Sequence, residues 1–235
     1  MIQRHRGRAG AVAVAASLAL FLGVVVAGRG GADHGSGASL PPGTLAPLAS
    51  LGNLRSPGLA GPPGPEGVAV PNGLPLTGGV PARGSSPVDG IQCEEAEQVL
   101  FHIHAHLTVF VSGAARQIPF GIGIPAAQIS ATPAGPFVGA GSCFYWLHTH
   151  AADGIIHIES PVQRTYTLGN FFDVWGQKLG PTEVGPATGP VTAFYNGRLF
   201  RGNPRDIPLS KHAQIQLDVG RPLVAPVQIS FPAGL

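Results

Sequence analysis

The stretch VLFHIHAHLTVFV, residues 99–111, places a histidine at every second position among apolar side chains. Successive side chains of a β-strand point to opposite faces of the sheet, so this alternation predicts a strand. One face is apolar and made of Phe101, Ile103, Ala105, Leu107 and Val109. The other carries polar side chains, among them His102, His104 and His106. We therefore expect one face to pack in the core and the other to present imidazoles.

A second histidine-bearing stretch, FYWLHTHAADGIIHIES at residues 144–160, predicts a hairpin. Its first strand would end at His150, its turn would use residues 151–154, and its second strand would begin at residue 155. A four-residue turn places His148 opposite His157, with Cβ atoms about 5 Å apart, close enough for both imidazoles to reach one ion. A three-residue turn would shift the register by one residue and send His157 to the other face.

Six histidines on two such segments indicate a metal site, because imidazole is the commonest transition-metal ligand. Histidine at strict period two lowers β-propensity without adding core packing, so a solvated polar face explains the pattern less well. A pH-sensing cluster is a further alternative. The only methionine is at position 1, so the thioether ligands that favour Cu(I) are absent. We expect Zn or Cu, with the predicted ligands His102, His104, His106, His148, His150 and His157.

Two functions fit this prediction. The protein could capture or deliver a metal ion, or it could be an enzyme in which three histidines leave an open metal position for hydration, hydrolysis or copper redox chemistry. Glu159 shares a predicted face with His157 and could be a ligand, an acceptor for an imidazole N–H, or a general base. Asp153 fits an ordinary turn residue. The surplus of histidines favours binding over catalysis.

The N-terminus has the pattern of an export signal. Arg4, Arg6 and Arg8 precede an apolar run over residues 9–27. Residues 1–27 are therefore predicted to be a signal peptide or an N-terminal membrane anchor, because Val25–Ala27 suits cleavage while the run is nearly long enough to span a bilayer. We expect an extracytoplasmic location, with membrane contact only through an uncleaved leader.

The next segment, residues 28–89, is rich in Gly and Pro and has no periodic apolar face. Such a composition predicts a disordered linker. It would tether a histidine-rich β domain at residues 90–235. Without the three leader arginines, 11 basic residues stand against 12 acidic ones, and no basic cluster suggests nucleic-acid binding.

Within the domain, the two cysteines of an exported chain predict a disulfide between Cys93 and Cys143. TLGNFFDVWG at 167–176 predicts a short amphipathic helix with Thr167 as N-cap, and the Asn-Gly pair in VTAFYNGRLF, residues 191–200, predicts a hairpin. The segments AQIQLDVG and PVQISF are predicted to be strands. The expected fold class is β-rich α+β, with antiparallel strands and hairpins forming a sandwich or curled sheet and one short helix.

The ordered set FHIHAHLTVFVSG, FYWLHTHAADGIIHIESP, TLGNFFDVWG and RDIPLSKHAQIQL resembles an uncharacterised family of exported bacterial proteins. The likeness covers about the last 145 residues, and the paired histidine segments are its most specific part. It implies that the histidine pattern belongs to the family, but it implies no particular activity.

Overall fold

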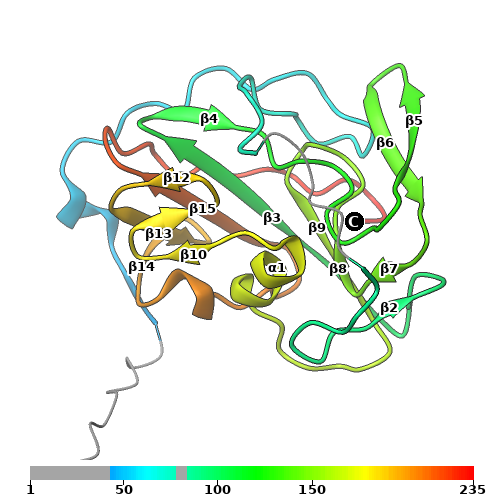
Figure 1. Cartoon of the computed structure of the whole chain (residues 1–235). Helices are drawn as coiled ribbons and strands as arrows, with labels where there is room; N and C mark the ends of the chain where they lie inside the picture. The colour runs from blue at the N-terminus through cyan, green and yellow to red at the C-terminus, as the bar shows by residue number, and fades with distance from the viewer. Residues whose placement is uncertain (1–42, 78–83) are drawn as a thin grey trace, which may run out of the picture. The chain divides into compact units, whose positions relative to one another are not determined.

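A computed structural model describes residues 43–77 and 84–235 (Figure 1). The predicted leader, residues 1–27, lies outside the described part of the chain. The main element is an eight-stranded mixed sheet in the order β1-β14-β13-β15-β3-β9-β8, with β4 paired to β3. Its strands are β1 (Thr44–Ala46), β3 (Phe101–Val111), β4 (Ala114–Arg116), β8 (Leu147–His148), β9 (Ile155–Ser160), β13 (Val191–Tyr195), β14 (Arg198–Arg201) and β15 (Ala213–Val219).

The centre of this sheet is β3, the strand that the alternating sequence predicts. It pairs in parallel with β15, from Ala105 opposite Ala213 to Val111 opposite Val219, and antiparallel with β9. Three small sheets add to the main one, so the described chain is β-rich with one α-helix, as predicted. Their strands are β2 (Cys93–Glu94) with β7 (Phe144–Tyr145), β5 (Gln128–Thr132) with β6 (Gly135–Ala140), and β10 (Leu179–Gly180), β11 (Glu183–Val184) and β12 (Ala187–Thr188).

One face of the main sheet forms the hydrophobic core with α1 (Leu168–Trp175). The helix begins where Thr167 and Asn170 form a reciprocal capping box and ends at Gly176, whose φ of 74° is left-handed. It buries aromatic side chains against the apolar residues of three strands. The buried set includes Leu107, Val109, Ile156, Ile158, Leu217, Phe171, Phe172 and Trp175. The apolar half of the alternation in β3 therefore packs as expected.

The opposite face carries the polar half of that alternation, and two extended segments cover it. The segment 43–77 includes the short helix η1 (Leu48–Leu51) and binds the C-terminal segment, where Arg55 N–H donates to the Leu223 carbonyl and Ala225 N–H to the Arg55 carbonyl. Val68 and Val224 are both buried. The covering chain therefore consists of irregular segments held by hydrogen bonds to other parts of the protein and by buried apolar side chains.

This arrangement corrects part of the linker prediction. Residues 43–77 belong to the same compact unit as the β domain, β1 pairs with β14, and Leu76 joins the hydrophobic core. The composition gave no sign of order because the segment has no periodic apolar pattern. Its backbone groups form hydrogen bonds with residues that are distant in the sequence. Residues 28–42 and 78–83, which the prediction also covered, lie outside the described residues.

Several local predictions are confirmed. Asn196 and Gly197, both at positive φ, connect β13 to β14, as expected for an Asn-Gly hairpin. Cys93 and Cys143 form a disulfide.

The predicted strand PVQISF, residues 226–231, is not regular, because its backbone bonds to glutamine side chains of β15 in place of a neighbouring strand. Within 43–77 and 84–235, no helix is long and apolar enough to cross a membrane.

Candidate metal centre

Strand pairing brings the two histidine segments together around His157. In β9 this residue lies opposite His104 of β3 on one side and opposite His148 of β8 on the other. The pairing of His148 with His157 is the register that a four-residue turn predicts. His102 lies opposite Glu159 in the same ladder. A row of imidazoles therefore crosses three adjacent strands on one face of the sheet.

The first cluster joins His102, His104, His157 and Glu159. His104 Nε2 lies 3.1 Å from both His102 Nε2 and His157 Nδ1. Glu159 Oε1 lies 3.1 Å from His102 Nε2 and 3.2 Å from His157 Nδ1. Ligands bonded to one ion at about 2.0–2.1 Å are separated by about 2.8 Å in square-planar and about 3.3 Å in tetrahedral geometry. The four donor atoms therefore have spacings suited to a shared transition-metal ion.

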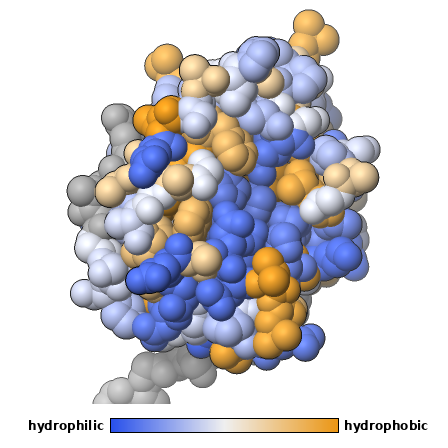
Figure 2. Space-filling view, turned by 90° about the vertical axis from the view of Figure 1, so that its right-hand side faces the viewer, coloured by the Kyte–Doolittle hydropathy of each residue, from blue (hydrophilic) through white to orange (hydrophobic). Residues whose placement is uncertain are grey.

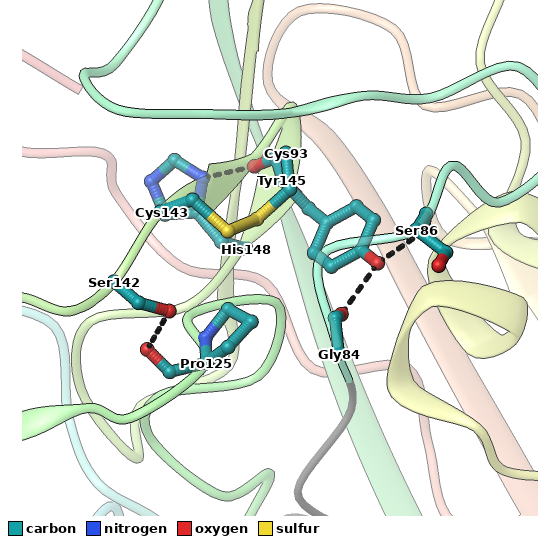
Figure 3. Close-up of a disulfide and its surroundings, with 8 residues drawn as sticks. All are labelled: Gly84, Ser86, Cys93, Pro125, Ser142, Cys143, Tyr145 and His148. Carbon is teal, nitrogen blue, oxygen red and sulfur yellow. Dashed lines mark hydrogen bonds between the residues drawn. A yellow bond between two sulfur atoms is a disulfide. The ribbon is translucent and has the colours of Figure 1, made fainter.

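The second cluster joins His148 and His150 with His157 and Glu159. Hydrogen bonds to the backbone fix the orientation of the imidazoles of His148 and His150. His148 Nδ1 donates to the Tyr145 carbonyl at 2.8 Å (Figure 3). His150 Nδ1 donates to the Val138 carbonyl. Each Nδ1 therefore carries the proton, which leaves a lone pair on each Nε2 when the ring is neutral.

Both rings are held neutral by their surroundings. Burial lowers the pKa of His148 well below its ordinary value, and burial together with the charge of His157 lowers the pKa of His150. The two Nε2 atoms, both acceptors, nevertheless lie only 3.1 Å apart. Two lone pairs cannot hydrogen-bond to each other, so this approach needs a cation to stabilise it. Imidazoles fixed through Nδ1–H to backbone carbonyls are typical of metal ligands.

Carboxylates in and around this cluster have unpaired oxygens. Glu66 Oε1 lies 2.7 Å from His157 Nε2. The second oxygens of Glu66 and Glu159, and Oδ2 of Asp153, are buried without a hydrogen-bond partner in the described structure. Burial by itself lowers the pKa of His157, but hydrogen bonds to Glu159 and Glu66 raise it to about 9. Negative charge around this ring therefore favours a cation, either a proton on the ring or a metal ion beside it.

Sequence reasoning did not find Glu66, because it lies in the stretch predicted to be a linker. A tight turn holds it in place: Gly67 N–H donates to the Gly64 carbonyl at 2.9 Å, and Gly64 N–H donates to the Val68 carbonyl at 2.7 Å. Glu66 is the only acidic residue between positions 43 and 77. Its position as a single acidic residue in a mostly apolar stretch is the one sequence feature that marks Glu66. Without the fold, this feature does not indicate that the carboxylate contacts His157.

Of the six predicted ligands, His106 lies in neither cluster. Its Nε2 donates to the Asp153 carbonyl at 2.9 Å, and burial lowers its pKa to about 4. The turn after β8 supplies that carbonyl, so this imidazole is satisfied by the backbone. Asp153 is a turn residue as predicted, with Oδ1 accepting from Ile155 N–H, but it is fully buried and its pKa is raised to about 7 by burial and by Glu66.

The clusters reach the surface at one end. His102 is the exposed member, with 38% of its side chain accessible, whereas the other members are buried. Glu97 has a partly exposed side chain whose Oε1 lies 3.4 Å from His150 Nε2. Figure 2 shows hydrophilic side chains gathered in the middle of the face that lies at the right of Figure 1, with apolar side chains around them. An ion could therefore enter without crossing the apolar core.

Comparison of the chain with models of protein families, with curated proteins and with solved structures found no match. The site is therefore defined by its own geometry. It consists of buried histidine and glutamate clusters within metal-binding distance, in a β-rich domain. The disulfide between Cys93 and Cys143 suggests an oxidising, extracytoplasmic environment.

Proposed function

We propose that this protein binds a transition-metal ion, Zn or Cu, through its histidine clusters, and that it captures or delivers the ion outside the cytoplasm. The observation that carries the proposal is the pair of Nε2 lone pairs on His148 and His150, which face each other at 3.1 Å. Backbone carbonyls hold both rings in this orientation. A cation bound to both nitrogens accounts for the arrangement and uses the ligand type that Zn and Cu prefer.

Burial favours a binding protein over an enzyme. His148 is fully buried, and Glu159 is 3% exposed. An ion surrounded by such donors is enclosed by protein atoms, which leaves little room for a substrate. The predicted leader, the disulfide and the resemblance to exported bacterial proteins support a role outside the cytoplasm.

A metal-dependent enzyme is the second candidate, and one observation favours it. Glu159 Oε2 is buried beside the imidazoles without a hydrogen-bond partner, so it could accept a proton from a metal-bound water. In that case the ion would keep a water ligand, which a Co-substituted sample would show by visible spectroscopy as a pH-dependent change. A fully protein-ligated ion would show no such change.

The experiment that tests the proposed function is isothermal titration of the full chain with Zn²⁺ and, separately, with Cu²⁺. We expect stoichiometric binding to the wild type. His148→Ala should weaken binding by more than the 10- to 100-fold that is typical of losing an outer-shell partner. The matched control is His212→Ala, because this histidine stacks on Phe231 outside the clusters. If neither ion binds the wild type, the proposed function is wrong.

A further inference from the structure

The donors around His157 are too many for one ion. The clusters contain five imidazoles and Glu159, and Glu66 adds a second buried carboxylate. A Zn site usually has four ligands, and its bonds to nitrogen and oxygen are about 2.0–2.2 Å long. Two donor atoms on one ion therefore lie at most about 4.4 Å apart. Donors that lie farther apart than this limit must bind different ions, so the positions of the donors on β3 and β8 indicate how many ions the site can hold.

Each cluster contains one His-X-His pair, and the two pairs lie on opposite sides of β9. His102 and His104 come from β3, whereas His148 and His150 come from β8 and the residues after it. Strands separated by one intervening strand are about 10 Å apart. Within each pair the two Nε2 atoms are already 3.1 Å apart. Each pair therefore has the geometry to hold an ion of its own.

Between the pairs lie the two residues that the clusters share, His157 and Glu159. Glu159 Oε1 faces His102 and His157, whereas its Oε2 is buried without a hydrogen-bond partner. A carboxylate whose two oxygens have such different surroundings can bind one ion with each oxygen. Two-metal sites hold their ions about 3.5–4 Å apart in this manner.

We propose that the cluster is a dinuclear metal centre, with one ion at His102 and His104, a second at His148 and His150, and Glu159 as the bridging carboxylate. This inference rests on the proposed function and specifies its stoichiometry. Charge is consistent with it, because the buried carboxylates Glu66 and Glu159 would offset two of the four positive charges of two divalent ions. Glu66, bonded to His157 from the covering segment, then stabilises the centre from above the sheet.

The test is elemental analysis and Cu²⁺ electron paramagnetic resonance on the full chain after equilibrium dialysis. We expect two ions per wild-type chain and a spin-coupled Cu²⁺ signal. His104→Ala and His150→Ala should each retain one ion and give an uncoupled signal, whereas His212→Ala should retain two. Because the wild type alone reports both stoichiometry and coupling, the test does not depend on how well a variant folds.

Other results would overturn the inference in distinguishable ways. One ion in the wild type, lost in both His104→Ala and His150→Ala, would show a single mononuclear site while leaving the proposed function intact. Two ions with uncoupled signals would contradict the bridging role of Glu159. No ion in the wild type would contradict the proposed function itself.

Discussion

Two rows of polar side chains lie on the same face of the sheet and have the same spacing along their strands. On β3 and its neighbours the row consists of imidazoles, whereas on β15 it consists of Gln214, Gln216 and Asp218. The strands are in parallel register, with His106 opposite Gln214. We call the imidazoles that cross β3, β9 and β8 the imidazole row, and the three polar side chains of β15 the β15 row. They share their periodicity and are mostly buried, but they differ in how their polar atoms are satisfied.

In the β15 row, the C-terminal segment supplies the partners. Val224 N–H donates to Asp218 Oδ2 at 2.6 Å, and Val227 N–H donates to Gln216 Oε1 at 2.8 Å. Gln216 Nε2 donates to Asp218 Oδ1 and to the Val224 carbonyl. These side chains act as an additional ladder that fixes the covering segment. Buried polar groups in stable proteins are normally satisfied in this way.

In the imidazole row, the side chains face one another. The Nε2 atoms of His148 and His150 are both acceptors, and a buried oxygen of Glu159 has no partner. The difference separates a polar row that stabilises the fold from one that is arranged for a ligand. Four predictions test this distinction.

The largest expected effect is stabilisation by the ion. A thousandfold excess over the dissociation constant adds about 4 kcal/mol to the free energy of unfolding. At about 2–4 °C per kcal/mol, the Tm of the wild type should rise by about 8–16 °C with Zn²⁺ or Cu²⁺ in scanning calorimetry. The double variant His104→Ala/His148→Ala should lose this shift, whereas Gln216→Ala should keep it. An equal shift in the double variant would contradict the assignment.

The β15 row should show a pH dependence of its own. Burial raises the pKa of Asp218 to about 6, although the Val224 N–H and Gln216 lower it. Between pH 4 and pH 6 the folded carboxyl holds a proton that the unfolded chain has lost. The free energy of unfolding should therefore fall as pH rises through this window, by up to about 3 kcal/mol.

The measurement is urea unfolding in the presence of a chelator, comparing wild type with Asp218→Asn at each pH. The subtraction removes the contribution of the other titrating groups, among them His106, whose lowered pKa gives the opposite slope. A difference between the two proteins that does not change from pH 4 to pH 7 would show that Asp218 does not titrate in this window.

A smaller effect is expected from Gln216→Ala. Removing this side chain leaves the partly buried N–H of Val227 without its acceptor and takes a donor from the buried Val224 carbonyl, which costs about 1–3 kcal/mol. Urea unfolding should show the loss, while titration calorimetry should show an unchanged affinity for Zn²⁺. A large loss of affinity would mean that the β15 row also supports the ion site.

The smallest effect is expected from His106→Gln, which places glutamine opposite Gln214. His106 bonds to the Asp153 carbonyl and belongs to neither cluster, and the glutamine amide can replace that donor. Metal affinity should stay within about threefold and stability within about 1 kcal/mol of the wild type. A hundredfold loss of affinity would return His106 to the ligand set that the sequence predicted.

His106 shows which features of the site could be predicted from the sequence and which could not. Alternation in residues 99–111 predicted the strand and its polar face, and the four-residue turn predicted the pairing of His148 with His157, because both depend on local geometry. Period two cannot distinguish a ligand from a histidine that bonds to a distant carbonyl. Nor could it place Glu66, whose approach to His157 depends on a covering segment with no periodicity.

The most direct test of the central claim is anomalous diffraction from crystals of the full chain loaded with Zn²⁺ or Cu²⁺. The account predicts an anomalous peak about 2.0–2.1 Å from both His148 Nε2 and His150 Nε2, with the two Nδ1–H groups still bonded to the carbonyls of Tyr145 and Val138. No peak at this position, or a peak confined to the β15 row or to the surface, would contradict it.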